Sequence, residues 1–355
     1  METTENSDLD PYVQRFVRQE RFAALGAEGG LRLRGSKALI CGCGALGTMI
    51  AERLARAGVG SLRIVDRDWV ELSNLPRQTL FTEQDAIHSR PKAIAAAAAL
   101  AAIDSRLNIE PVVADLTCDN IRELADGCDV ILDGTDNFET RFLVNDYAFS
   151  QRVPWVHGGC LGASGQVMTI VPGMTACFRC LVPNLPARDS METCDSAGVL
   201  GPAIGVVACW QAAEALKILS GNVSAVSQEL LVIDTWNTTC RTVSLNGLKQ
   251  RGRQCPVCVQ GNFQFLNGEL RTETVVLCGK NAVQVRMAAS EKLIGNLGEL
   301  AERLQHSGKV TNNGFFLRLT LPDHVLTVFR DGRAVVEGTT DPIEAKNLLS
   351  KTLGG

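Results

Sequence analysis

The first half of the chain alternates short apolar runs with longer segments of helical character. The runs predicted to be buried strands lie at residues 36–44, 61–66, 129–134 and 153–159. The segments predicted to be helices between them lie at residues 45–58, 91–104 and 137–150. This alternation predicts an α/β fold in which helices cover both faces of a doubly wound, mostly parallel, Rossmann-like sheet.

The pattern changes after about residue 160. Residues 165–172 and 229–245 have strand character, and an apolar helix is predicted at about 202–219, so we expect an antiparallel extension of the sheet. Ahead of the main fold, residues 10–24 carry apolar side chains at helical spacing and are predicted to form one amphipathic helix.

A polar, glycine-containing passage at 259–270 is predicted to be a linker, so we expect two domains, 1–262 and 263–355. The second is expected to be a small α+β domain of unassigned role. Its predicted elements are a strand at 274–287, a helix at 297–308, a hairpin at 315–339 and a closing helix at 341–355. The only cysteine after Cys258 is Cys278, in a strand-like segment.

Composition narrows the classes of partner. The chain has 35 Lys and Arg against 39 Asp and Glu, so no overall positive field attracts nucleic acid or an anionic membrane. Its acidic start lacks an apolar signal region, and no run approaches about 18 apolar residues. We therefore expect a cytoplasmic protein. Thirteen cysteines in such a chain indicate metal, catalysis or burial, and not a disulfide scaffold.

The first site signal is CGCGALG, residues 41–47, which follows the first predicted strand. Its glycines, Gly42, Gly44 and Gly47, bring backbone N–H groups and a helix N-terminus to where a phosphate binds. Asp66, at the end of the second predicted strand, is placed to bind ribose hydroxyls. These residues fit any Rossmann-like nucleotide site, so an NAD- or FAD-dependent oxidoreductase stays open at this point.

Polar residues beyond the loop narrow the ligand. The stretch DRDWVELSNLPRQTLF gathers Asp66, Asp68, Glu71, Asn74, Arg77 and Gln78 directly after the second strand. Further on come Lys92, at a predicted helix start, and the DGTDN residues Asp133, Asp136 and Asn137, at the carboxyl end of a strand. Ligands bind at such ends in open α/β sheets. Two cations and an acid there suit a triphosphate with Mg²⁺, and a merely solvated charged loop is the alternative.

In their order and spacing, CGCGALG, SNLPRQTLF and DGTDNFETR resemble the ThiF/MoeB/HesA superfamily, adenylyltransferases that activate ubiquitin-like sulfur carriers. The resemblance covers about residues 10–260. The nucleotide-binding set that it implies is Gly42, Gly44, Ala45, Gly47, Asp66, Asp68, Ser73, Asn74, Arg77, Gln78, Lys92, Asp136 and Asn137. Within this set it implies phosphate contacts from Asn74, Arg77 and Lys92, and a Mg²⁺-linked acid at Asp136.

The resemblance also extends to the N-terminal stretch FVRQERF. In the superfamily an arginine of this motif, here Arg18, reaches the ATP site of the neighbouring subunit, which implies a homodimer with shared active sites. Two residues depart from the usual pattern: Ala45 stands where many relatives have glycine, and Pro76 replaces a more usual polar residue. A contact through the backbone tolerates the change at Ala45.

Two cysteine pairs predict a metal site. Cys177 with Cys180 and Cys255 with Cys258 each have the two-residue spacing at which both thiolates can bind one tetrahedral zinc ion. The superfamily has zinc at the matching place. Four protein ligands leave no open position, so we expect this zinc to be structural and not catalytic. Plain buried thiols are the alternative.

The remaining cysteines are interpreted separately. Cys194 lies in the polar stretch PARDSMETCDSAG, and in the superfamily this cysteine can accept the activated carrier as a thioester or acyl-persulfide. A passive loop cysteine is the alternative. The cysteines predicted to lie mostly in apolar core segments are Cys41, Cys43, Cys118, Cys128, Cys160, Cys209, Cys240 and Cys278. The histidines show no spacing that suggests a second metal site.

The function that this sequence predicts is ATP- and Mg²⁺-dependent adenylylation of the C-terminal glycine carboxylate of a Gly-Gly-ending carrier, with release of pyrophosphate. A carboxylate is already a nucleophile, so no general base is needed. The product would enter sulfur transfer for molybdopterin, thiamine or thiolated tRNA, with a cysteine desulfurase or rhodanese as sulfur donor.

Three other functions stay open: an activating enzyme of a bacterial ubiquitin-like conjugation system, a Rossmann oxidoreductase, and an inactive scaffold. The oxidoreductase leaves SNLPRQ and DGTDN unexplained, and the scaffold does not account for Arg77, Lys92 and Asp136 together. The chain's own Gly354–Gly355 is interpreted as a helix stop, and an activated carrier end is the alternative.

Overall fold

The structure is a computed structural model. It describes residues 10–186, 197–251, 254–270, 274–277, 281–286, 297–329 and 332–353. The chain divides into two compact units, Met1–Glu269 and Leu270–Gly355, and each is described by itself. The candidate sites all lie in the first unit.

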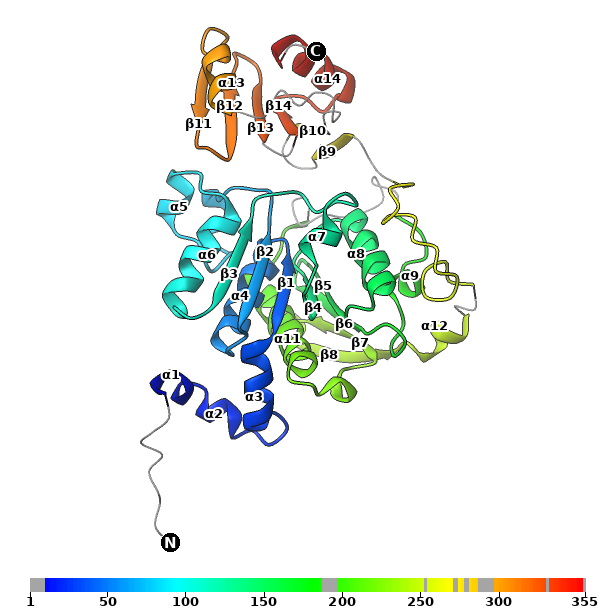
Figure 1. The fold of residues 1–355 in the computed structure, drawn as a ribbon. Helices are drawn as coiled ribbons and strands as arrows, with labels where there is room; N and C mark the ends of the chain where they lie inside the picture. The colour runs from blue at the N-terminus through cyan, green and yellow to red at the C-terminus, as the bar shows by residue number, and fades with distance from the viewer. Residues whose placement is uncertain are drawn as a thin grey trace. The chain divides into compact units, whose positions relative to one another are not determined.

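The first unit is built on an eight-stranded sheet with the order β3-β2-β1-β4-β5-β6-β7-β8 among the described residues (Figure 1). The parallel strands are β1 (Lys37–Cys41), β2 (Ser61–Val65), β3 (Asn108–Val112), β4 (Val130–Asp133) and β5 (Trp155–Leu161). The antiparallel extension consists of β6 (Ser164–Ile170), β7 (Glu229–Asp234) and β8 (Thr239–Ser244). The predicted mostly parallel sheet with an antiparallel extension is therefore confirmed.

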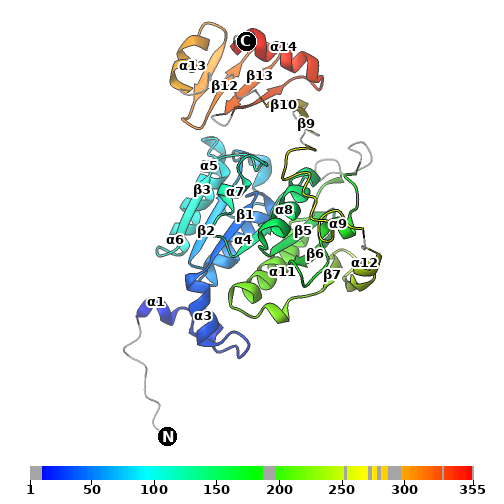
Figure 2. The same cartoon turned by 45° about the vertical axis from the view of Figure 1, so that its right-hand side comes forward.

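Helices cover both faces of this sheet, as Figures 1 and 2 show. One core contains side chains of α4 (Ala45–Arg56), α6 (Lys92–Ile103) and α11 (Gly201–Leu219). The other contains side chains of α7 (Ile121–Leu124), α8 (Phe138–Gln151) and α9 (Phe178–Leu181). Strand β1 serves both, because Ala38 and Ile40 enter the first core while Leu39 and Cys41 enter the second. The doubly wound architecture is confirmed.

Helix α11 is, among the described residues, the one helix that is long and apolar enough to cross a membrane. Its composition has another explanation, because it packs against α4 and along β5 and β6. Side chains such as Ala203, Val207 and Ala215 are fully buried there. Its apolar character follows from its place in the core.

The N-terminal prediction is wrong in detail. Residues 10–24 form two short helices, α1 (Pro11–Gln14) and α2 (Val17–Glu20), and α3 (Gly26–Gly35) was not predicted. Tertiary contacts break the predicted helix: Phe16 is buried so closely against Gly58 that a Cβ there would lie 2.7 Å from its ring. The hydroxyl of Tyr12 donates to Asp104 over 2.9 Å. Further short elements of this unit are η1 (Leu72–Asn74), α5 (Glu83–Ile87), η3 (Val223–Ala225) and α12 (Asn246–Arg251).

The second unit contains an antiparallel sheet with the order β11-β12-β13-β14-β10-β9 in its described part. Its strands are β9 (Thr274–Leu277), β10 (Ala282–Arg286), β11 (Lys309–Asn312), β12 (Phe316–Thr320), β13 (Val325–Phe329) and β14 (Arg333–Glu337). Helices α13 (Leu297–Leu304) and α14 (Pro342–Leu353) share its apolar core. The α+β class is confirmed.

Two predicted elements of this unit are corrected. Residues 274–287 form two strands and not one, and Asn281 adopts a φ of +43° between them. Residues 315–339 form three strands and not a hairpin, and Gly332, with a φ of +83°, precedes the last of them. Apolar alternation detects strand character but does not count the reversals within it.

Candidate functional site

The glycine loop brings three backbone segments into close contact. Gly42 has a φ of +85°, and a Cβ there would lie 2.7 Å from the carbonyl oxygen of Gly134. A Cβ on Gly47 would lie 1.9 Å from the oxygen of Gly42. A Cβ on Gly44, before the first residue of α4, would lie 4.0 Å from both Nε2 of Gln78 and the oxygen of Gly134, so packing would admit it there. Two glycines are therefore required by packing, and Gly44 borders the place where a phosphate can approach.

Asp66 follows β2 and faces this loop. Its two carboxylate oxygens accept the N–H groups of Cys43, over 2.6 Å, and of Asp68, over 2.7 Å. Burial raises the pKa of Asp66, although the nearby Lys92 lowers it. Each carboxylate oxygen can accept further hydrogen bonds. Asp66 is thus held rigidly and can still bind ribose hydroxyls.

Lys92 begins α6 and is almost fully buried. Its Nζ lies 3.3 Å from Oδ2 of Asp68. Burial lowers the pKa of Lys92, but the carboxylates of Asp68, Asp66 and Asp136 together raise it above its ordinary range. A charged ammonium group therefore pairs with Asp68 and interacts electrostatically with Asp66 and Asp136. Such an ammonium group can pair with phosphate oxygens, and the acids can bind a metal ion.

Sequence reasoning missed two charged residues at this edge of the sheet. Arg67 lies between the predicted acids Asp66 and Asp68, and its guanidinium is 3.4 Å from Asp115. Burial lowers the pKa of Arg67, but Asp115, Asp68 and Asp136 raise it well above its usual range. The sequence did contain a signal for Arg67, because a cation between two acids that are both predicted ligands indicates a place in the same site. Asp115 gave none, since it follows β3, which was not predicted.

Some polar side chains of the SNLPRQ segment form hydrogen bonds that stabilise the segment itself. The side-chain oxygen of Asn74, a buried residue, accepts the N–H of Glu71 over 3.0 Å and closes the turn η1. Ser73 is exposed, and its carbonyl accepts a 2.8 Å hydrogen bond from half-buried Arg77. Gln78 is buried against the space above Gly44, and its Oε1 has no hydrogen-bond partner among the described residues. Gln78 therefore has an unused acceptor, which is buried in this structure.

The DGTDN residues divide into structural and available ones. Both oxygens of Asp133 are occupied, by Thr135 and by Arg141 and His157. The side chain of Asn137 caps α8 by accepting the N–H of Thr140 over 2.8 Å. Asp136, in contrast, is exposed, and its charge acts on both Lys92 and Arg67.

The structure does not gather every predicted catalytic residue. Arg18 lies exposed on α2, outside the group around the glycine loop. Cys194 lies outside the described residues, as do Cys278 and Gly354–Gly355. The predicted roles of Arg18 and Cys194 therefore stay predictions.

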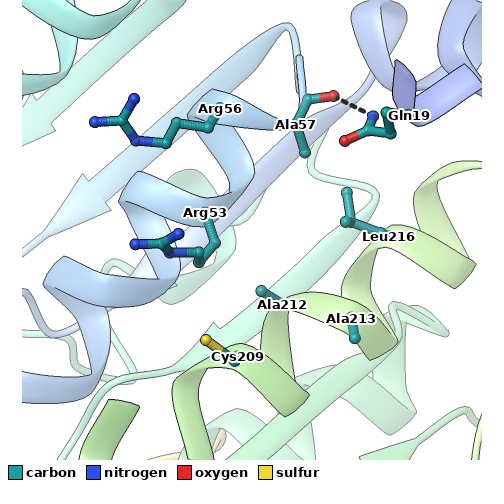
Figure 3. Close-up of a pocket in the computed structure, with 8 residues that line it drawn as sticks. All are labelled: Gln19, Arg53, Arg56, Ala57, Cys209, Ala212, Ala213 and Leu216. Atoms are coloured by element: carbon teal, nitrogen blue, oxygen red, sulfur yellow. Dashed lines mark hydrogen bonds between the residues drawn. The ribbon is translucent and has the colours of Figure 1, made fainter. Parts of the chain in front are cut away.

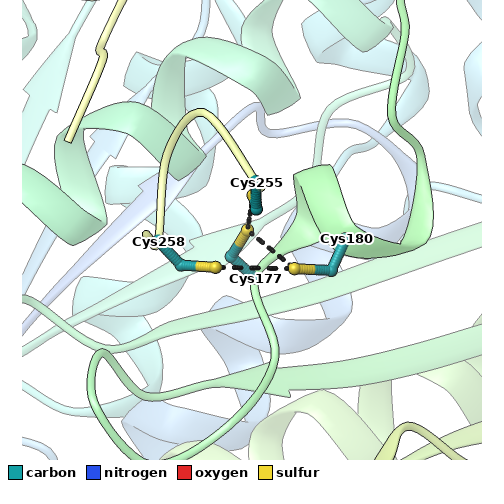
Figure 4. Close-up of side chains that lie close together, drawn as sticks. All are labelled: Cys177, Cys180, Cys255 and Cys258. Carbon is teal, nitrogen blue, oxygen red and sulfur yellow. Dashed lines mark hydrogen bonds between the residues drawn. The ribbon is translucent and has the colours of Figure 1, made fainter. Parts of the chain in front are cut away.

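The second site is a cluster of four thiols (Figure 4). The sulfur of Cys177 lies 3.6 Å from that of Cys180 and 3.5 Å from that of Cys255, and Cys180 lies 3.5 Å from Cys258. A zinc ion with Zn–S bonds of about 2.3 Å separates its tetrahedral ligands by about 3.8 Å. The two pairs, remote in sequence, thus form a cluster of the right chemistry and size for Zn²⁺.

Helix α8 anchors the chain around both cysteine pairs. The side chain of Asn145 accepts the N–H of Phe178 over 2.9 Å, next to the first pair. Asp146 accepts the N–H groups of Phe265, over 2.9 Å, and Leu266, beyond the second pair. Because Phe265 and Leu266 are buried in the core of the first unit, the passage 259–270 is no free linker, contrary to the sequence prediction.

Asp146 is expected to make stability depend on pH. Burial raises its pKa to about 6. Because this exceeds the value of about 3.9 in the unfolded chain, the native state binds the extra proton, and this contribution to stability is lost as pH rises through 6. Relative to Asp146→Asn, the wild-type free energy of unfolding should fall by about 1 kcal/mol between pH 5 and pH 7.5. Urea denaturation of both proteins measures this, and parallel pH profiles would contradict it.

The other cysteines only partly follow the prediction of core packing. Cys41, Cys43 and Cys128 are buried, as expected. Cys209 on α11 and Cys240 on β8 are exposed, which corrects the prediction, and Cys118 and Cys160 are partly buried. Cys209 has apolar neighbours in the sequence because α11 as a whole is apolar, but it lies on a face of α11 that is exposed.

A Rossmann-like sheet whose glycine loop is surrounded by acids and a buried lysine, with a four-thiol cluster at its extension, defines a class of nucleotide-binding α/β enzyme. Within that class the chain belongs to the ThiF family, whose sequence model matches residues 16–257.

Named relatives agree with this family. The chain is 41% identical over 341 residues, 96% of its own length and 99% of the relative's, to the sulfur carrier protein ThiS adenylyltransferase of Bacillus subtilis (strain 168). It is 38% identical over 260 residues, 73% of the chain and 92% of the relative, to the SAMP-activating enzyme E1 of Haloferax volcanii. It is 37% identical over 246 residues, 69% of the chain but only 52% of the relative, to the adenylyltransferase and sulfurtransferase MOCS3 of Danio rerio.

Solved structures share the fold. The crystal structure of E. coli MccB has a TM-score of 0.60 at 19% identity, over 72% of this chain and 73% of that one. This likeness concerns the fold alone.

Proposed function

We propose that this chain is an ATP-dependent adenylyltransferase that activates the C-terminal glycine carboxylate of a ubiquitin-like sulfur-carrier protein. The observation that carries the proposal is the arrangement at one edge of the sheet. The fixed acid Asp66 binds the backbone of the glycine loop, and the buried cation Lys92 interacts electrostatically with Asp66 and with the exposed acid Asp136. The names of the relatives, sulfur carrier protein ThiS adenylyltransferase among them, support it.

In the proposed reaction a carboxylate oxygen of the carrier forms a bond to the α-phosphorus of ATP. The bond from that phosphorus to the bridging oxygen of the β-phosphate breaks, and pyrophosphate leaves with the electron pair. Asp66 binds the ribose, and backbone groups at Gly44 and Ala45 approach the phosphates. Lys92 and Arg77 neutralise charge on the phosphates, and no protein base is required because no proton is removed.

Mg²⁺ is the second expected participant, and Asp136 is its proposed ligand. The fit rests on the chemistry of the group: Asp136 is an exposed carboxylate that faces two cations, and hard oxygen donors are what Mg²⁺ prefers. When bound, Mg²⁺ supplies charge neutralisation for the departing pyrophosphate. Asp133 cannot serve, because its oxygens already accept hydrogen bonds from protein groups.

A carrier-dependent exchange of radioactive pyrophosphate into ATP tests the proposal. Exchange requires reversible adenylate formation, so it should appear only when enzyme, ATP, Mg²⁺ and a carrier ending in Gly-Gly are all present. A carrier that lacks its last glycine is the matched control. Absence of exchange with carriers of the thiamine, molybdopterin and tRNA-thiolation systems would contradict the proposal.

A second candidate function also forms the adenylate, so it is separated by the fate of the carrier and not by the exchange assay. The relative named SAMP-activating enzyme E1 favours an activating enzyme for ubiquitin-like conjugation. In that case the carrier would be found on lysine side chains of other proteins after the reaction. For sulfur transfer, a thiocarboxylate at the carrier's end would form when a cysteine desulfurase or rhodanese supplies sulfur.

We also propose that the reaction takes place in the cytoplasm.

We also propose that the enzyme acts as a homodimer whose subunits share active sites. A groove of about 280 Å³ lies between α2, the end of α4 and α11, lined among others by Gln19, Arg53 and Cys209 (Figure 3). Beside it, α11 exposes Val206 and Trp210, with 39% and 42% of their surfaces accessible. An apolar stripe of this kind on a core helix is suited to a second copy of the same chain. Arg18 lies on α2, next to Gln19 of this groove.

Two experiments test the shared site. Trp210→Glu is expected to convert the dimer into monomers, which analytical ultracentrifugation measures. Mixing Arg18→Ala with Asp136→Ala subunits should restore about a quarter of wild-type exchange, because half of the dimers are mixed and each contains one intact site. If each inactive variant stays inactive after mixing, while mixed dimers are demonstrably present, Arg18 does not act across subunits.

A further inference from the structure

A buried polar cluster lies directly beneath the turn that carries Asp136. The turn Gly134–Asp136 leaves β4 and touches the glycine loop, since a Cβ on Gly134 would lie 2.4 Å from the oxygen of Gly42 and 3.0 Å from the Cα of Gly47. The N–H of Gly134 also donates to the carbonyl of Cys41 over 2.8 Å. With backbone packed on backbone and no side chain to yield, a movement of this turn must move the glycine loop.

Arg141 binds the chain on both sides of Gly134 with a single guanidinium group. Its Nε donates to Oδ2 of Asp133 over 3.2 Å, and its Nη2 donates to the carbonyl of Thr135 over 2.7 Å. The same Nη2 lies 3.4 Å from the carbonyl of Gly158 on β5. Arg141 is 9% exposed, and its guanidinium forms an ion pair with Asp133. One planar group thereby fixes the residues before and after Gly134.

His157 completes the cluster from β5. Its Nδ1 lies 2.6 Å from Oδ2 of Asp133, and the residue is fully buried. Burial lowers the pKa of His157, so the cluster is one carboxylate, one guanidinium and one neutral imidazole with no net charge. The amide of Gln211 adds a 2.9 Å hydrogen bond to the main-chain carbonyl of Asp133.

We propose that Arg141 and His157 are positioning residues: acting through Asp133, they hold the Gly134–Asp136 turn so that Asp136 and the glycine loop are in place to bind ATP. The inference rests on the function proposed above and adds a layer behind its site. It assigns Arg141, in the last position of DGTDNFETR, to the geometry of the loop and not to the phosphates. His157, which no sequence pattern marked, is assigned the same task.

The test compares two arginines with the same kind of contacts. Arg63 on β2 also bridges a carboxylate, Glu110 over 2.7 Å, and a main-chain carbonyl, that of Leu124 over 2.6 Å. Arg141→Lys and Arg63→Lys both keep the charge and lose the bridge, since an ammonium cannot span both acceptors in the fixed geometry of a guanidinium. They should therefore be destabilised to a similar extent.

Isothermal titration calorimetry with Mg²⁺–ATP is the first readout. Arg141→Lys should bind ATP about ten times more weakly than the wild type, whereas Arg63→Lys should bind within about a factor of two, because only the first frees the turn. Hydrogen–deuterium exchange of the peptide that contains Gly134–Asp136 should be faster in Arg141→Lys alone. Both readouts need no carrier, so they remain informative if the exchange assay of the proposed function fails.

A second variant covers the case in which Arg141→Lys does not fold. His157→Phe keeps a ring against Phe178, whose centroid lies 4.8 Å from that of His157, and removes only the hydrogen bond to Asp133. It should weaken ATP binding about threefold and accelerate exchange of the same peptide. Wild-type ATP affinity and wild-type exchange of the turn in the folded variants would overturn the proposal.

Discussion

Asp136→Ala is expected to abolish carrier-dependent pyrophosphate exchange without destabilising the protein. The side chain is exposed, so its removal should change the free energy of unfolding by no more than about 0.5 kcal/mol. If it binds Mg²⁺, its loss removes charge stabilisation from the leaving pyrophosphate, and we expect a fall in exchange rate of at least about 10²-fold. The measurement is the initial rate of exchange at saturating carrier, with thermal unfolding of the same preparation.

A matched control distinguishes this role from a general charge effect. Glu83 is also an exposed acid, on α5, and Glu83→Ala removes the same charge away from the glycine loop. It should retain the wild-type rate. A high Mg²⁺ concentration should partly rescue Asp136→Ala if binding is weakened and not lost. Wild-type exchange by Asp136→Ala would remove this residue from the proposed mechanism.

Removing the metal from the thiol cluster is expected to have the largest effect on stability. We propose that Cys177, Cys180, Cys255 and Cys258 bind one structural Zn²⁺ per chain. A ligand present at about 1,000 times its dissociation constant stabilises the folded state by about 4 kcal/mol. Cys177→Ser should lose the metal and this contribution, because it removes the most buried thiol of the cluster.

Metal content and thermal unfolding measure this prediction together. Plasma mass spectrometry should find about one zinc per wild-type chain. In Cys177→Ser it should find almost none, and the melting temperature should fall by about 8–16 °C. Cys240→Ser is the control, since Cys240 is an exposed cysteine outside the cluster. Equal zinc content in the two variants, or equal melting temperatures, would show that the cluster is not the site of a stabilising metal.

Much of the fold was accessible from local pattern. The apolar runs predicted as strands became β1, β2, β4 and β5, and the alanine-rich segment became α6. Each of these segments has an apolar composition of its own, so a short stretch of sequence is enough to predict that it is buried. Strand β3 escaped because it lies at the edge of the sheet, is only partly buried and contains Pro111. It therefore shows neither an apolar run nor an alternation.

The break in the predicted N-terminal helix at Phe16 was not foreseen, for a different reason. Residues 10–24 have the periodicity of one helix, and nothing within the segment disfavours it. The contacts that divide it come from Gly58, Asp104 and Ile103, far along the chain. Local propensity amounts to a fraction of a kcal/mol per residue, which burial of one phenylalanine and two polar anchors outweighs.

The candidate site shows the same division. The motifs predicted Asp66, Lys92 and Asp136 at one edge of the sheet, where strand ends meet, and in the structure Lys92 interacts electrostatically with both acids. They did not show that Asn137 caps a helix or that both oxygens of Asp133 are occupied. The residue type determines which hydrogen bonds a side chain can form, but only the surrounding structure determines which of them it does form.

The sequence by itself determined the family and the two cysteine pairs, and it predicted the class of nucleotide site, because these depend on residue type and on spacing along the chain. The tertiary structure alone decided that the two pairs form one cluster, that Gln78 faces the glycine loop, and that Arg141 and His157 meet at Asp133. The reason is physical: each of these contacts joins segments that are remote in sequence. Such contacts are set by how the strands and helices pack, which no local window contains.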